Sequence, residues 1–84
     1  MEKIRTTVRI AGKDYNIAGY DPEDHVQRVA AYVDRKISEA ALAAHLPADK
    51  AAVLVALNIA DELMRAHDEN SRLRRELMTL RQER

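Results

Sequence analysis

Cysteine, tryptophan and phenylalanine are absent from this 84-residue chain, and glycine and proline each occur only twice. Without cysteine, no disulfide bond or thiolate metal site can stabilise the fold, as expected of a protein in the reducing cytoplasm. Gly12 and Gly19 are too few and too far apart for a glycine-rich loop that holds a phosphate group. These absences exclude several common classes of site, and we expect no cofactor.

Excess charge of one sign and long apolar runs are also lacking. Fourteen Lys and Arg residues balance fourteen Asp and Glu residues, so no overall field attracts nucleic acid or a membrane. The longest apolar run, residues 51–57, is far shorter than the roughly 20 residues of a membrane span. No signal peptide is recognisable. We therefore expect a soluble protein without direct membrane insertion.

Catalytic and metal-binding patterns are equally scarce. His25, His45 and His67 are at least twenty residues apart, so no two of them have the helical spacing of a metal site. Asp61 and Glu62 are adjacent and would point about 100° apart around a helix, which makes them a poor acid–base pair. We expect neither a metal site nor an enzyme.

The N-terminal residues alternate in the two-residue period of a half-buried strand. The apolar face carries Ile4, Thr6, Val8 and Ile10. Residues 11–14 predict a turn in which Gly12 takes a positive φ, and the alternation then resumes in residues 15–19. The sequence therefore predicts a β-hairpin over about residues 3–18. Because an isolated hairpin is marginally stable in water, its apolar face needs a helix or a second subunit.

Two helices are predicted after the hairpin. Asp21 suits an N-cap and Pro22 the first position of a helix over about residues 22–45, before Pro47 interrupts it. No glycine or proline follows, so a second helix can span about 36 residues, or about 54 Å. We expect its first half to pack beside the first helix and the rest to project. The prediction is an α+β fold with a head over residues 1–64 and a tail over residues 65–84.

The tail has apolar residues along one seam. With Ala56 at position a, the a and d positions follow the heptad pattern of a coiled coil, with acidic g and basic e positions beside them. The predicted seam consists of Ile59, Leu63, Ala66, Asn70, Leu73, Leu77 and Leu80. We therefore predict that the partner of this helix is its own copy.

The charges beside the seam favour a parallel homodimer. Position g of one helix faces the following e of a parallel partner, so Glu69 would meet Arg74 and Glu76 would meet Arg81. An antiparallel pair would set like charges against each other. Asn70 suits a two-stranded parallel register, although it could also lie exposed on a frayed helix.

Two features of the tail leave alternatives open. The last fourteen residues contain five arginines and two glutamates, and a basic helix that extends from a coiled coil is typical of dimeric DNA-binding proteins. However, the arginines flank the seam itself and no aromatic residues are interleaved, so we expect no nucleic-acid partner. Met64 and Met78 either widen the seam for a tetramer or are ordinary exposed residues. A generic coiled-coil adaptor is a further alternative.

Three stretches resemble one family in the same order: "VRIAGKDYNIAG", "VQRVAAYVDRKISEA" and "KAAVLVALNIADEL". They are similar to the ZapA family of bacterial Z-ring-associated proteins, over about residues 4–80 and most specifically in "AVLVALNIADEL". The resemblance implies a hairpin-and-helix head, a coiled-coil tail, and dimers that can pair into antiparallel tetramers. It also implies binding to the tubulin-like division GTPase FtsZ, whose protofilaments would be bundled at mid-cell without catalysis. The chain resembles the short versions of the family.

The resemblance further implies that charged residues of the head contact FtsZ. Lys13 matches a basic turn position of the family, whereas Asn16 replaces a residue that can be basic. The candidate contacts are Arg5, Arg9 and Lys13 on the polar side of the hairpin, with Arg35 and Lys36. Ordinary solvated charge is the alternative for each of them.

Three further polar or aromatic residues are interpreted as structural. Asn58 lies inside an apolar run, so we expect its amide to bind backbone groups within the head. Tyr15 and Tyr32 are interpreted as core aromatics whose hydroxyl groups reach water.

Overall fold

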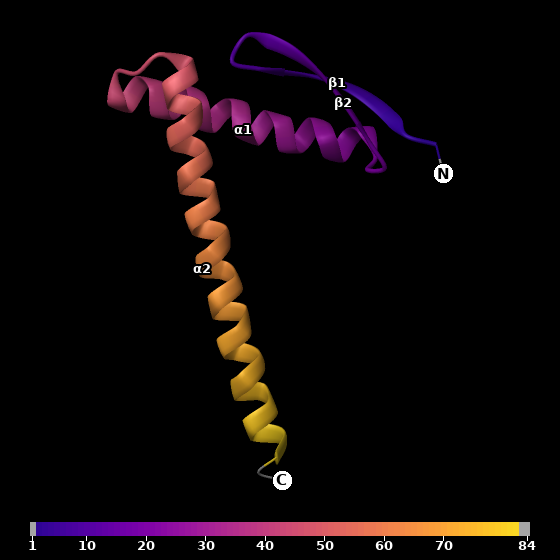
Figure 1. The fold of residues 1–84 in the computed structure, drawn as a ribbon, viewed down its shortest axis with the longest axis vertical. Helices are drawn as coiled ribbons and strands as arrows, with labels where there is room; N and C mark the ends of the chain where they lie inside the picture. Colours follow the sequence, from indigo (N-terminus) through magenta and orange to yellow (C-terminus); the bar gives the residue numbers. More distant parts are fainter. Residues whose placement is uncertain (1, 83–84) are drawn as a thin grey trace.

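The computed structural model describes residues 2–82 as a β-hairpin and two helices. Strand β1 (Ile4–Ile10) pairs antiparallel with β2 (Lys13–Gly19), and α1 (Glu23–Ala44) lies against β1 (Figure 1). Helix α2 (Ala48–Gln82) crosses α1 and then extends away from the head. The predicted α+β fold and its order of elements are confirmed.

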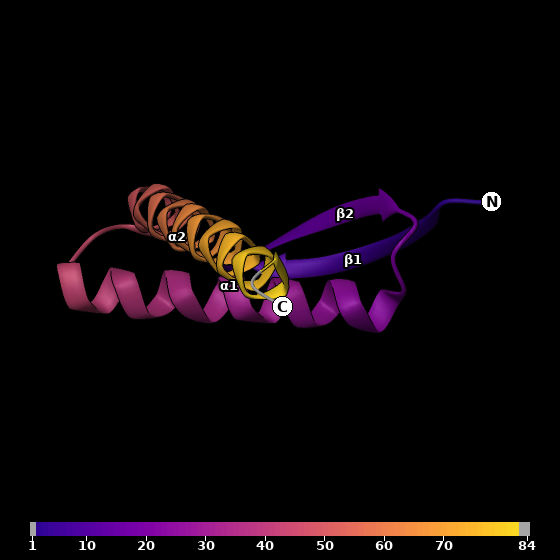
Figure 2. The ribbon, with the colours of Figure 1, turned by 90° about the horizontal axis from the view of Figure 1, so that it is seen from below.

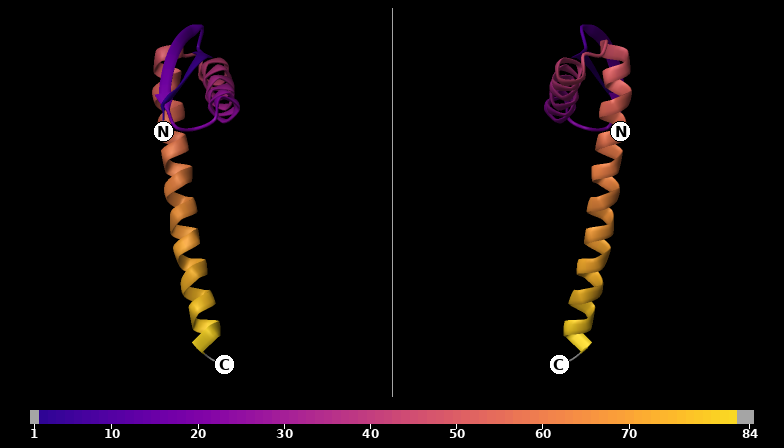
Figure 3. Two further views of the ribbon diagram at one scale, coloured as in Figure 1. Left: turned by 90° about the vertical axis from the view of Figure 1, so that its right-hand side faces the viewer. Right: turned by 90° about the vertical axis from the view of Figure 1, so that its left-hand side faces the viewer.

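The two helices cross instead of lying side by side. The chain direction turns by 111° between them. The molecule is an L (Figure 1) that is thin when seen from below (Figure 2), with extents of 56 × 41 × 14 Å. The expectation that the first half of α2 packs along α1 is therefore wrong. Only the first turns of α2 contact α1, and the remainder projects far beyond the head (Figure 3).

The head core lies at this crossing. Ile37 of α1 and Ala51 and Val55 of α2 are buried there together. Half-buried apolar residues from β1, both helices and the connecting loop complete the core: Ile10, Val33, Ala40, Ala41, Leu46, Ala52 and Ile59. A core this small contributes little net stability to one chain.

The hairpin turn is tied to α1. Ile10 pairs with Lys13, which leaves Ala11 and Gly12 as the turn residues, with φ of 53° and 79°. Such a two-residue turn needs positive φ at both positions; it suits glycine but costs alanine about 1–2 kcal/mol. The Ala11 amide donates a 2.8 Å hydrogen bond to the carboxylate of Asp34. Helix α1 therefore holds the turn in place.

Only the β1 half of the hairpin is covered. Thr6 and Val8 are 2% exposed beneath α1, as the alternation predicted. Among the elements of residues 2–82, strand β2 contacts β1 alone, and Tyr15 and Ile17 are 46% and 43% exposed. The interpretation of Tyr15 as a core aromatic is therefore wrong.

Helix α1 begins without the predicted side-chain cap. Pro22 occupies the N-cap position and no side chain caps the helix, so the expectation for Asp21 is wrong. Acidic residues in the first turn still favour the positive end of the helix. At the other end, His45 takes the left-handed conformation and its amide donates to the Ala41 carbonyl, which terminates the helix.

Candidate functional site

The predicted coiled-coil seam lies along one side of α2. Its residues are Ile59, Leu63, Ala66, Asn70, Leu73, Leu77 and Leu80. Ile59 packs partly against the head core, whereas the four leucines are 49–61% exposed. No other part of residues 2–82 covers them. The structure thus presents an apolar stripe that starts at the head and follows the projecting helix, and its role as an interface stays a prediction.

The acidic residues beside the seam are bound within the chain. Arg72 donates from Nε to Glu69 at 3.2 Å and from Nη1 to Glu76. The hydrogen bond and charge of Arg72 lower the pKa of Glu69, and Glu69 raises the pKa of Arg72. Arg74 and Arg81 are exposed. Carboxylates that were predicted to meet a second copy are therefore already oriented by Arg72.

The predicted basic surface of the hairpin is divided. Arg5 and Arg9 lie on the face turned away from α1, where Arg9 binds Asp14 at 3.2 Å. Lys13 is directly opposite Ile10, and opposed residues share a face of the sheet. The prediction that Lys13 joins Arg5 and Arg9 on the polar side is therefore wrong, because the two-residue period places it with the apolar residues of β2.

The remaining basic candidates gather around one aromatic ring of α1. The guanidinium carbon of Arg35 and Nζ of Lys36 lie 5.4 Å and 5.5 Å from the ring centre of Tyr32, within the range of cation–π attraction. Glu39 is 3.7 Å from Arg35 and 3.9 Å from Lys36. Tyr32 is 41% exposed, so its interpretation as a core residue is wrong.

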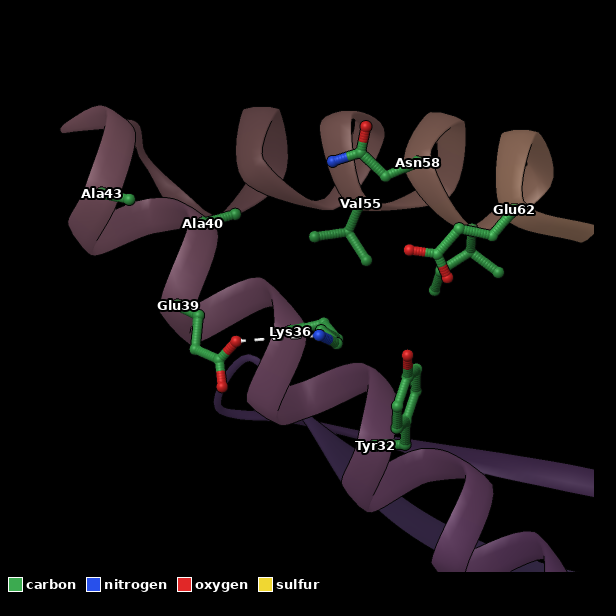
Figure 4. Close-up of a pocket in the computed structure, with 9 residues that line it drawn as sticks. Tyr32, Lys36, Glu39, Ala40, Ala43, Val55, Asn58 and Glu62 are labelled. Atoms are coloured by element: carbon green, nitrogen blue, oxygen red, sulfur yellow. Dashed lines mark ion pairs between the residues drawn. The ribbon is translucent and has the colours of Figure 1, made fainter.

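A solvent-open cavity of about 270 Å³ occupies the corner between α1 and α2. Figure 4 shows the Tyr32 hydroxyl and the Glu62 carboxylate both directed into this space. Asn58 also lines the corner and is exposed, and no side-chain hydrogen bond among residues 2–82 includes it, so the expectation that its amide binds backbone groups within the head is wrong. Sequence reasoning missed the corner because it exists only at the observed helix crossing.

Metal-binding and membrane-spanning features were also sought within residues 2–82. No group of three His, Cys, Asp or Glu side chains there could hold a metal ion. No single described helix is long and apolar enough to cross a membrane. Helices α1 and α2 pass that test of length and composition only as a pair bent by 111°.

Comparisons with known proteins agree on one family. Residues 6–84 match the family model described as Cell division protein ZapA. The Cell division protein ZapA of Geobacillus kaustophilus is 43% identical over 76 residues, which cover 89% of this chain and 84% of that protein. Its counterpart in Halalkalibacterium halodurans is 40% identical over 68 residues, covering 80% and 75%.

A solved structure extends this agreement to the fold. A ZapA mutant dimer from Geobacillus stearothermophilus matches with a TM-score of 0.75 at 40% sequence identity, over 92% of this chain and 91% of the other. Sequence and architecture therefore give the same answer over nearly the whole chain: it belongs to the ZapA family of cell division proteins.

Proposed function

We propose that this chain is a non-catalytic scaffold that forms a parallel homodimer through α2, binds FtsZ and bundles its protofilaments at the mid-cell division site in the cytoplasm. The observation that carries the proposal is the stripe of half-exposed leucines on a helix that the described chain leaves uncovered. Membership of a cell division family supports the cellular role, and the dimeric relative supports self-pairing.

The exposed area of the chain supports a second copy. The chain exposes 7300 Å², whereas a compact protein of 9.5 kDa would expose about 5,000 Å². The difference, about 2,300 Å² per chain or about 4,600 Å² for a pair, falls in the range of total area that obligate homodimers bury. Because the head core is small, association would also supply stability that one chain lacks.

The charges beside the seam support the parallel orientation. Acidic g and basic e positions face each other in a parallel pair, and like charges would meet in an antiparallel pair. A parallel dimer places both heads at one end, so a repeating filament can bind two heads at once and far more tightly than one. Met64 and Met78 are exposed at b positions outside the two-stranded seam, where they would widen the apolar stripe for a tetramer with heads at both ends.

The orientation has a direct test in a variant with one cysteine. In a parallel coiled coil the two copies of position a lie opposite each other, whereas in an antiparallel coil a faces d. Asn70→Cys should therefore form an interchain disulfide under mild oxidation, and Glu69→Cys, one position away, should not. Failure of Asn70→Cys to cross-link in a protein that is dimeric by light scattering would contradict the parallel arrangement.

The FtsZ contact is proposed at the exposed basic residues of the head. Arg5 and Arg9 share the outer face of the hairpin, and Arg5 takes part in none of the ion pairs among residues 2–82. Lys13 lies beside the turn, whereas Arg35 and Lys36 are engaged with Glu39 and an aromatic ring. The hairpin is therefore the first surface to alter.

Co-sedimentation with FtsZ tests the function. FtsZ assembled with GTP should pellet as bundles and scatter more light when this protein is added. Arg5→Ala with Arg9→Ala should reduce binding without changing the dimer mass, and Thr7→Ala on the same face is the control. A dimeric protein that leaves FtsZ pelleting and light scattering unchanged would contradict the proposal and favour a coiled-coil adaptor with another partner.

A further inference from the structure

Glu62 differs from Glu69 and Glu76, the next two glutamates at the same heptad position. Both of those are bound to Arg72, whereas none of the ion pairs among residues 2–82 includes Glu62. Arg65, three residues further along α2, is already bound to Asp61 at 2.9 Å. Glu62 therefore presents an uncompensated carboxylate where the seam meets the head.

The corner around Glu62 contains a carboxylate that takes part in none of the ion pairs among residues 2–82. Its ionisable lining consists of Lys36 and Glu39 from α1, Glu62 from α2, and the hydroxyl of Tyr32. Lys36 lies 3.9 Å from Glu39 and over the ring of Tyr32. Glu39 is also paired with Arg35, whereas the Glu62 carboxylate points into the space between the helices (Figure 4).

We propose that this corner is completed by His67 of the partner subunit, whose imidazole binds the Glu62 carboxylate at the mouth of the cavity. The proposal rests on the parallel dimer of the proposed function. In that dimer, position g of one helix faces the following e of the other, and the e position that follows Glu62 is His67. Two-fold symmetry gives two such sites.

The chemistry makes this contact sensitive to pH. A histidine side chain ordinarily gains its proton near pH 6.5, and an imidazolium donates a stronger hydrogen bond to a carboxylate than neutral imidazole does. Among the groups nearby, Lys36 and Arg35 oppose a positive charge on the partner's His67. Glu39 and the neighbouring Asp68 favour that charge. Arg65 and Asp61 offset each other. The partner's His67 is therefore held best when it is charged, and the dimer tightens as the pH falls.

The two predicted interchain pairs further along the tail, Glu69 with Arg74 and Glu76 with Arg81, contain arginine in place of histidine. Arginine stays charged throughout the accessible pH range, so these contacts do not change between neutral and mildly acidic solution. The corner is thus the place where the proposed interface responds to pH, and the response can be assigned by substitution.

The test is the dimer dissociation constant, from sedimentation equilibrium at about pH 5.5 and about pH 8, on either side of the histidine titration. The unaltered protein should dimerise on the order of three- to tenfold more tightly at the lower pH, as expected for two exposed ion pairs. Glu62→Gln and His67→Gln should each abolish this difference. The control, His25→Gln on α1, removes a histidine that lies away from the corner and should retain the difference.

The outcomes separate this site from the dimer that it needs. A dimer whose affinity is independent of pH, or a His67→Gln variant that keeps the pH dependence, overturns the corner site and leaves the parallel dimer standing. A protein that is monomeric at both pH values at high concentration overturns the proposed function and the corner site together.

Discussion

The two halves of α2 present the same side of one helix to different surroundings. Near its start, Val55 and Ile59 pack on α1. Further along, the same side of the helix carries Leu63, Ala66 and Asn70, which no other part of residues 2–82 covers. Every residue from 60 to 82 is exposed. Helix α1 thus covers in the head the stripe that the tail leaves open. The comparison teaches that α1 is the packing partner of the head part of α2 and that the tail has no such partner within residues 2–82. The helix of a second copy would supply one.

The largest effect is expected from breaking the tail half. Leu73→Ala with Leu77→Ala removes two seam residues from each copy, and truncating a buried leucine costs about 2–5 kcal/mol. The dimer dissociation constant should therefore rise at least about a hundredfold, with bundling lost in parallel. Sedimentation equilibrium measures the change.

The matched control removes apolar side chains from outside the seam. Met64→Ala with Met78→Ala truncates two residues at b positions that are exposed in the chain, so the dimer dissociation constant should not change, even if the pairing of dimers into tetramers is weakened. Far-UV circular dichroism should report a folded head in both variants. If the leucine variant stays dimeric at concentrations like those of the unaltered protein, the seam is not the interface.

The next effect in size is expected from breaking the head half. Ile37 is 5% exposed and packs on Ala51 and Val55, so Ile37→Ala should lower the free energy of unfolding by about 2–5 kcal/mol. Val53→Ala, on the outer side of the same part of α2 and 62% exposed, should cost less than about 0.5 kcal/mol. Urea titrations at one protein concentration measure both. Equal losses would mean that the outer side of α2 is covered in the assembly.

Local features of the molecule could be predicted from the sequence because neighbouring residues decide them. Alternation identified the strands, Gly12 the turn, Pro47 the break between helices, and the spacing of three and four residues the helical faces. Arg72 could also have been found, because it lies three and four residues from two glutamates. The same period that identified β2 places Lys13 on its apolar face.

Features that depend on how elements meet were not accessible to pattern reasoning. The 111° turn between α1 and α2 follows from packing at the crossing, and no periodicity encodes it. Asn58 and Tyr32 therefore line an open corner, whereas the sequence patterns predicted that both lie within the packed head. Exposure of Tyr15 has the same origin, since within residues 2–82 α1 packs on β1 and makes no contact with β2.

A smaller effect of opposite sign is expected within the head. The Thr6 hydroxyl is buried and has no hydrogen-bond partner in the described chain, and leaving such a group unsatisfied costs about 1–3 kcal/mol. Thr6→Val keeps the shape and should raise the free energy of unfolding by about 1 kcal/mol. In contrast, Thr7→Val removes an exposed hydroxyl that donates to Asn16 at 2.7 Å and should give no gain. Urea titration of both variants decides whether burial causes the difference.

The smallest effect is expected in the tail, at the exposed charges beside the seam. Arg72 lowers the pKa of Glu69 from 4.5, so the stabilisation is complete above about pH 4.5 and is lost as the pH falls through the lowered pKa. Tail helicity, followed by circular dichroism at low salt, should therefore fall on acidification, and added salt should weaken the effect.

Arg72→Gln should start with lower helicity and lose less of it on acidification. Arg75→Gln is the control, because Arg75 takes part in no ion pair among residues 2–82. If Arg75→Gln reduces the loss of helicity on acidification as much as Arg72→Gln does, then the net charge of the tail, and not the pairing of Arg72, sets its dependence on pH.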